Sequence, residues 1–210
     1  MAATLFDWIF HLDTHLAMLA AQHGAWVYVV LAAVIFVETG LVVMPFLPGD
    51  SLLFVAGALA AGGALNLAVL VVALSAAAIA GDAVNYAIGS YCASRLSDGA
   101  RMRWINPAHL AKTRTFFDRH GRKTIILARF VPIVRTLAPF VAALGKMPYK
   151  TFLAYNAIGG VTWVVLLAGA GYLFGQVQWI QTNLTAVLLG LVVLSILPGI
   201  FEWWRGRRKA

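Results

Sequence analysis

The sequence has few charged residues: Asp, Glu, Lys and Arg make up 11% of the 210 positions, and apolar residues make up 61%. An average soluble domain is about one quarter charged, so water is not expected to be the main solvent of this chain. Cysteine is almost absent as well. The single Cys92 excludes an intramolecular disulfide, and without clustered Cys and His side chains we expect neither a metal nor another cofactor.

Basic residues are missing from the N-terminal part, since all 16 Lys and Arg lie at Arg95 or later. Most of them fall in the 95–123 stretch, at Lys146 and Lys150, and in the tail 205–209. Blocks of this kind beside apolar runs are typical of the cytoplasmic side of a membrane protein. The net charge of +8 is therefore attributed to membrane topology, and nucleic acid is not an expected partner.

Two apolar segments, 25–60 and 124–145, are too interrupted to be ordinary membrane spans. Charge and proline break each of them near its middle, and neither half reaches the roughly 20 residues needed to cross a bilayer. The first segment fits either one kinked span or a re-entrant hairpin. Residues 65–93, 151–174 and 183–203, by contrast, are long and apolar enough for full spans.

The distribution of charge predicts which side of the membrane each connection faces. With a cytoplasmic C-terminal tail, the last two spans place Lys146 and Lys150 in the cytoplasm, where the basic 95–123 stretch also belongs. Residues 124–145 then begin and end on the same side, so they are expected to form a re-entrant hairpin. If residues 25–60 form a hairpin too, the two enter from opposite faces, as in transporters built from inverted repeats.

The expected fold is an all-α integral membrane protein in a single domain, residues 1–210. It has two opposed re-entrant hairpins with inverted-repeat character and about three full transmembrane helices. Residues 1–24 are expected to form an N-terminal interfacial helix. The 95–123 stretch should lie at the cytoplasmic surface and contain a short surface helix at 107–120.

Four charged residues interrupt the two broken segments: Glu38 and Asp50 in the first, Arg129 and Arg135 in the second. Each would cost about 2.5–3.5 kcal/mol if it were unpaired at the centre of a membrane helix, so they must be paired, hydrated or functional. Salt bridges between the acidic and the basic pair would lock the two hairpins together. A functional site is favoured over such a lock for two reasons. Desolvation can cancel the attraction between the charges of a buried ion pair. Interrupted helices with charged residues at membrane depth are tolerated where they line a cavity.

The chemistry of the side chains suggests their roles. Arg129 and Arg135 are assigned to substrate binding, because a guanidinium offers phosphate or carboxylate a planar fork of donors and keeps its charge in a low dielectric. Glu38 and Asp50 are assigned to proton or ion coupling, since a carboxylate among apolar groups can exchange a proton near neutral pH. Other residues are candidates for lining the cavity: Pro45, Pro48, Gly49, Pro132, Asp82, Asn85 and Asn156. For Asp82 and Asn85, a hydrogen bond that packs two helices is the alternative role.

Five short blocks of sequence carry a resemblance to a known family. They are, in chain order, ETG at 38–40, PFLPGDS at 45–51, ARFVPIVRT at 128–136, GKM at 145–147 and YNAIGG at 155–160. Together they look like the DedA family, also called the SNARE-associated or VTT-domain family. Both hairpin motifs are complete, and the blocks occur in the order of the family.

The resemblance implies a multi-pass protein of the bacterial inner membrane that moves lipids between leaflets and requires Glu38, Asp50, Arg129 and Arg135. Members are associated with recycling of undecaprenyl phosphate, with phospholipid translocation and with maintenance of the proton motive force. The expected partners are therefore a membrane lipid with a phosphate headgroup, protons or sodium ions, and, as a further candidate, a second copy of the chain. The alternative is a proton- or ion-coupled carrier of a small soluble anion. An enzyme is not expected, because no His/Asp or His/Glu constellation lies beside the hairpins.

Overall fold

The computed structural model describes residues 24–41, 49–96 and 121–178, together with the single positions 115, 117, 180, 187 and 190. Every regular element in these residues is a helix, and no strand occurs among them. The expected interfacial helix, most of the basic stretch and most of the last span lie outside the described residues. The all-α prediction is confirmed for the part of the chain that the structure describes.

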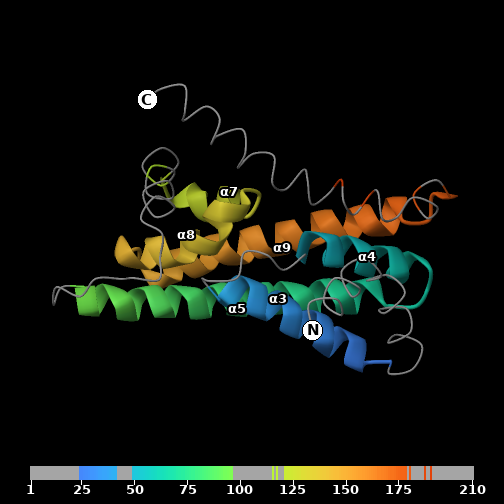
Figure 1. Cartoon of the computed structure of the whole chain (residues 1–210), viewed down its shortest axis with the longest axis horizontal. Helices are drawn as coiled ribbons and strands as arrows, with labels where there is room; N and C mark the ends of the chain where they lie inside the picture. The colour runs from blue at the N-terminus through green and yellow to red at the C-terminus, as the bar shows by residue number, and fades with distance from the viewer. Residues whose placement is uncertain are drawn as a thin grey trace, which may run out of the picture.

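The helices follow each other in the chain as shown in Figure 1: α3 (Trp26–Gly40), α4 (Gly49–Ala61), α5 (Leu67–Leu96), the 3-10 helix η1 (Gly121–Lys123), α7 (Thr124–Ala128), α8 (Pro132–Leu144) and α9 (Tyr149–Phe174). Among them, α5 and α9 are long and apolar enough to cross a membrane. The apolar part of α5 has 27 residues and α9 has 26. At a rise of about 1.5 Å per residue, each exceeds the roughly 30 Å of a bilayer's hydrocarbon core.

The two broken segments are built from shorter helices. α3 has 15 residues, α4 and α8 have 13 each, and α7 has 5, so none of them spans a bilayer by itself. The break between α7 and α8 has a local cause in Pro132, the first residue of α8. A proline disfavours helical geometry in the residue before it, and Val131 is indeed extended, with φ −125° and ψ 102°.

The long helices α5 and α9 lie against each other and form a frame for the broken segments (Figure 1). In the first broken segment, α3 packs on α5 and α4 packs on α9. In the second, α7 packs on α9 and α8 packs on α5. Figure 1 shows α4 toward one end of this frame and α7 and α8 toward the other. Both segments therefore contact the same pair of long helices. The first helix of one segment packs on α5 and the first helix of the other packs on α9, and the second helices do the reverse.

Apolar side chains form both the interior and much of the outer surface. The largest buried cluster joins α3, α4, α5 and α9 and includes Leu31, Leu53 and Trp163. On the outer faces, Val72 of α5 is 70% exposed and Leu173 of α9 is 71% exposed. An extensive exposed apolar surface is typical of a protein that contacts a membrane.

Glycines bring α4 and α9 into backbone contact. A Cβ atom added at Gly171 would overlap the carbonyl oxygen of Phe54, and one added at Gly57 would overlap the carbonyl oxygen of Ala168. Small residues at a helix interface in a membrane allow backbones to approach this closely, and van der Waals contact then stabilises the pair. The position of α4, which begins at the candidate site, depends on these glycines.

We expect Gly171→Leu to lower the thermal unfolding temperature of the detergent-solubilised protein by several degrees. The side chain would push α4 away from α9, and overpacking of this kind costs about 1–3 kcal/mol or more. The matched control is Gly169→Leu on the same helix, because a Cβ at Gly169 meets no atom within 4 Å. An equal loss of stability in the two variants would contradict the proposed contact.

Candidate functional site

Arg135 joins the two broken segments. It lies in the first turn of α8, donates from Nη1 to Oδ1 of Asp50 at 2.9 Å, and donates from Nη2 to Oε1 of Glu38. The side chains of Arg135, Asp50 and Glu38 are 10%, 22% and 1% exposed, respectively. One guanidinium therefore bridges the carboxylates at the end of α3 and at the start of α4.

Helix ends explain why these charges are found here. Glu38 faces the N-terminus of α4, where Gly49 leaves no room for a Cβ beside the carboxylate, and Asp50 lies in the first turn of the same helix. The partial positive charge of a helix N-terminus stabilises both carboxylates. Arg135 lies at the N-terminus of α8, where the same partial charge is unfavourable for a cation. Its two carboxylate partners offset that repulsion.

The cluster of Arg135, Glu38 and Asp50 carries an excess of one negative charge when both acids are ionised. Oε2 of Glu38 is also buried, against Gly49 at the start of α4. Charge in an apolar environment is costly unless it is compensated. The cluster can therefore accept a proton or a monovalent cation.

Arg129 lies in a second cluster, apart from Glu38 and Asp50. It directly follows the last residue of α7 and is 3% exposed. Its Nη2 donates to Oδ2 of Asp82 and also to Oδ1 of Asn156, the latter at 2.6 Å. The amide of Asn156 in turn donates to the carbonyl of Ile79 on α5 at 3.1 Å. This second cluster is electrically neutral, with one guanidinium and one carboxylate.

Asp82 and Asn85 turn out to have different roles. Asp82 was expected to line a cavity or to pack helices, but it forms an ion pair. A charged residue inside a full-length span is costly, and that cost was the signal in the sequence that Asp82 needs a cationic partner. Asn85 is fully buried and donates to the carbonyls of Thr39 on α3, at 3.2 Å, and of Thr136 on α8, at 2.9 Å. Asn85 thus makes the packing hydrogen bonds that were one of its two expected roles.

Trp163 lies between the two clusters, and no pattern in the sequence singled it out. The Cζ atom of Arg135 is 5.0 Å from the centre of its ring, and that of Arg129 is 5.8 Å away. Its Nε1 donates to Oδ1 of Asp50 at 3.0 Å, and the residue is 1% exposed. Trp163 therefore contacts both arginines through its π face and one acid through its indole N–H.

The remaining residues predicted to line a cavity are only partly described. Pro45 and Pro48 lie outside the described residues, and Pro132 marks the start of α8. Gly49 lies against the carboxylate of Glu38. Within the described part of the chain, no group of three or more His, Cys, Asp or Glu side chains could hold a metal ion.

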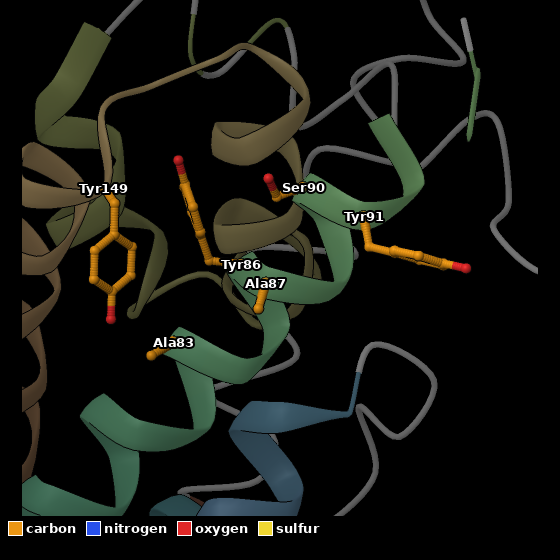
Figure 2. Close-up of a pocket in the computed structure, with 6 residues that line it drawn as sticks. All are labelled: Ala83, Tyr86, Ala87, Ser90, Tyr91 and Tyr149. Carbon is orange, nitrogen blue, oxygen red and sulfur yellow. The ribbon is translucent and has the colours of Figure 1, made fainter. Parts of the chain in front are cut away.

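A groove lies along α5 and the start of α9 (Figure 2). Its volume is about 570 Å³, and its lining consists of Ala83, Tyr86, Ala87, Ser90, Tyr91 and Tyr149. The hydroxyl of Tyr86 donates to the carbonyl of Met147, and its ring stacks on Phe152 at 4.5 Å. Tyr86 follows Asp82, and Phe152 precedes Asn156, by one helical turn. The stacked rings therefore lie one turn from the Arg129 cluster.

Comparison with known proteins assigns the chain to a family. The VTT domain matches residues 47–173. The chain is 53% identical over 208 residues to Protein DedA of Escherichia coli (strain K12), which covers 98% of this chain and 95% of that protein. It is 39% identical over 176 residues to an uncharacterized membrane protein of Mycobacterium leprae (strain TN), covering 84% and 79% of the two chains. The inner membrane protein YghB of Escherichia coli (strain K12) is 32% identical over 170 residues, which cover 81% and 78%.

No solved structure matches the chain. The family domain covers more than half of the sequence, and the similarity to Protein DedA extends over nearly all of it. It includes both broken segments and both arginine clusters. The chain therefore belongs to the DedA family of VTT-domain membrane proteins.

Proposed function

We propose that this protein moves a phosphate-bearing lipid, such as undecaprenyl phosphate or a phospholipid, between the leaflets of the bacterial inner membrane. The observation that carries the proposal is the bridge from Arg135 to Glu38 and Asp50, which joins the two broken segments inside an apolar frame. Guanidinium groups bind phosphate with directional, charge-assisted hydrogen bonds. Breaking and remaking this bridge would change the arrangement of the two segments.

In this proposal the broken segments are re-entrant hairpins that enter from opposite faces, with the C-terminus in the cytoplasm. The shortness of α3, α4, α7 and α8 supports it, because none of them reaches across a bilayer alone. The exchanged order in which the two segments contact α5 and α9 also fits an inverted pair. The name of the relative YghB, an inner membrane protein, supports the location.

Coupling to an ion follows from the excess negative charge around Arg135. A proton shared by Glu38 and Asp50, or a sodium ion beside them, would make that cluster neutral. When a lipid phosphate takes Arg135 away from the acids, the need for such compensation rises, because the carboxylates then lose their guanidinium partner. Binding of the lipid phosphate and binding of a proton or cation would thereby favour each other.

A lipid is favoured over a small soluble anion by the surroundings of the two clusters. The groove along α5 is lined by alanine, serine and tyrosine side chains, and the exposed Lys146 and Lys150 lie close in the sequence to its lining residue Tyr149. Apolar walls with cationic groups at one end suit an acyl or prenyl chain that carries a phosphate. A soluble anion would need an aqueous path through the same region.

The test is lipid movement in liposomes that contain the purified protein. Arg135→Lys and Glu38→Gln should each slow the movement of a fluorescent polyprenyl phosphate or phospholipid by about 10- to 100-fold, because hydrogen bonds to charged groups contribute about 1.5–3 kcal/mol. The control is Val72→Ala, on the exposed face of α5. Undiminished movement in both charge variants would refute the proposal. Uptake of a soluble anion without lipid movement would support the alternative carrier.

A further inference from the structure

Arg129 uses only a small part of its hydrogen-bonding capacity. Among the described residues, both of its side-chain hydrogen bonds, to Asp82 and to Asn156, come from Nη2. Nε and Nη1 are buried and have no hydrogen-bond partner among the described residues. Buried donors without a partner lose their hydration and gain nothing in return. An arginine that is only 3% exposed and keeps two nitrogen atoms unused is suited to a ligand that is not part of the chain.

Two glycines let the guanidinium pack directly on the backbone of α9. A Cβ added at Gly159 would lie 3.4 Å from Nε of Arg129, and one added at Gly160 would lie 3.3 Å from its Nη2. The guanidinium therefore lies along a strip of α9 that has no side chains. A phosphate has several oxygen atoms that could accept from Nε and both Nη atoms, whereas Asp82 engages Nη2 alone.

We propose that Asp82 is the counterion that the lipid phosphate displaces from Arg129, and that the displaced carboxylate takes up one proton. The proposal rests on the proposed lipid transport and makes Asp82 a third coupling carboxylate besides Glu38 and Asp50. In the exchange, the negative charge of the phosphate replaces that of Asp82 at the guanidinium. A proton from the bulk solution bonds to the released carboxylate oxygen, so that the cluster stays neutral when the phosphate carries one negative charge.

The proton is required because the described residues around Asp82 offer it no second cation that is free of other carboxylates. Besides Arg129, the charged group that acts on Asp82 is Arg135 on α8. Arg135 is already shared between two carboxylates. The nearby part of α9 contributes the uncharged side chains of Asn156 and Trp163. A carboxylate without a cation in such an apolar site becomes neutral by protonation.

Asn156 acts as a positioning residue in this exchange. Its side-chain oxygen accepts from Nη2 of Arg129, and its amide nitrogen donates to the carbonyl of Ile79. Because Asn156 is neutral, it does not compete with a phosphate for the charge of the guanidinium. It can hold Arg129 in place while Asp82 leaves and the phosphate enters.

The experiment is calorimetric titration of the full-length protein in mild detergent with farnesyl phosphate, a short prenyl phosphate, in buffers of different ionisation enthalpy at one pH. The wild type should take up about one proton more per bound ligand than Asp82→Asn, in which any uptake at the Arg135 cluster remains. Asp82→Asn should also bind about tenfold more tightly, since the competing carboxylate is gone. Asn156→Asp, which adds a second carboxylate beside Arg129, should bind about tenfold more weakly.

Variants of Glu38 and Asp82 show which cluster takes up the proton. If Asp82→Asn lowers the uptake by about one proton in a Glu38→Gln background as well, the proton belongs to the Arg129 cluster. If Asp82→Asn changes nothing in that background, the proton belongs to the Arg135 cluster and the inference is overturned. Asp82→Glu should restore the proton uptake that Asp82→Asn loses, because it keeps a carboxylate at this position. A merely structural role of Asp82 would not predict this recovery. Equal affinity and equal proton uptake in the wild type and Asp82→Asn would also overturn the inference.

Two further outcomes distinguish the role of Asp82 from the function on which it rests. A wild type that moves lipids in liposomes and binds farnesyl phosphate without proton uptake would leave lipid transport standing and refute the role of Asp82. A wild type that neither binds farnesyl phosphate nor moves lipids would refute both. Inorganic phosphate, titrated in parallel, separates the sources of the anion: binding as tight as that of farnesyl phosphate would indicate a soluble anion rather than a lipid headgroup.

Discussion

Arg135→Met is expected to lower the free energy of unfolding by about 3–5 kcal/mol, because it removes one partner from a buried ion cluster and leaves two carboxylates without compensation. Glu38 is the more affected of the two, since its side chain is only 1% exposed. Lipid movement should be lost in the same variant. Thermal unfolding in detergent and the liposome assay measure the two effects.

The triple variant Arg135→Met, Glu38→Gln and Asp50→Asn separates stability from function. It removes all three charges together, and a neutral cluster of similar volume should recover most of the lost stability. Lipid movement should stay absent, since Arg135 no longer binds the phosphate and Glu38 and Asp50 no longer exchange a proton. Recovery of lipid movement in the triple variant would mean that the cluster is only a structural lock. Arg122→Met, at an exposed position, is the control for loss of a positive charge.

The second large effect is expected at Trp163. Trp163→Leu should lower the free energy of unfolding by about 3 kcal/mol or more, because it leaves a cavity in the core and removes the π face from both arginines. Trp163→Phe keeps a ring beside Arg135 and Arg129 but loses the hydrogen bond to Asp50, so a smaller loss of about 1 kcal/mol is expected. Thermal unfolding in detergent measures both variants.

Leu166→Ala provides the comparison for Trp163, since Leu166 is on the same helix and is 54% exposed. Its replacement should change stability by less than about 0.5 kcal/mol, as is usual for surface positions. If Trp163→Phe were as unstable as Trp163→Leu, the hydrogen bond to Asp50 rather than the ring would hold the two clusters together. If both variants matched Leu166→Ala, Trp163 would have no part in connecting them.

Much of the architecture follows from local features of the sequence. The length of an apolar run decides whether a helix can span a bilayer, and this local property predicted α5 and α9 within a few residues. Pro132 acts on the residue before it, so the break ahead of α8 could also be read from the sequence. The cost of a charge in an apolar segment showed that Glu38, Asp50, Arg129 and Arg135 needed partners or a function.

The identity of those partners was decided by tertiary structure. Glu38 and Arg135 are separated by 97 residues in the chain, and Asp82 and Arg129 by 47, so no local pattern relates them. Which acid meets which arginine depends on how the half-helices pack on α5 and α9. In the packed structure Glu38 and Asp50 of the first broken segment both pair with Arg135. Arg129 pairs instead with Asp82 of the full span α5.

Sequence alone was therefore enough to establish an all-helical membrane protein with two broken segments and with charges that apolar surroundings do not tolerate unpaired. The packed fold divided those charges into two clusters, added Asp82, and placed Trp163 between them. Helix length and proline geometry act over a few residues, so they can be read along the chain. Ion pairing acts between atoms that only the packed fold brings within about 3 Å.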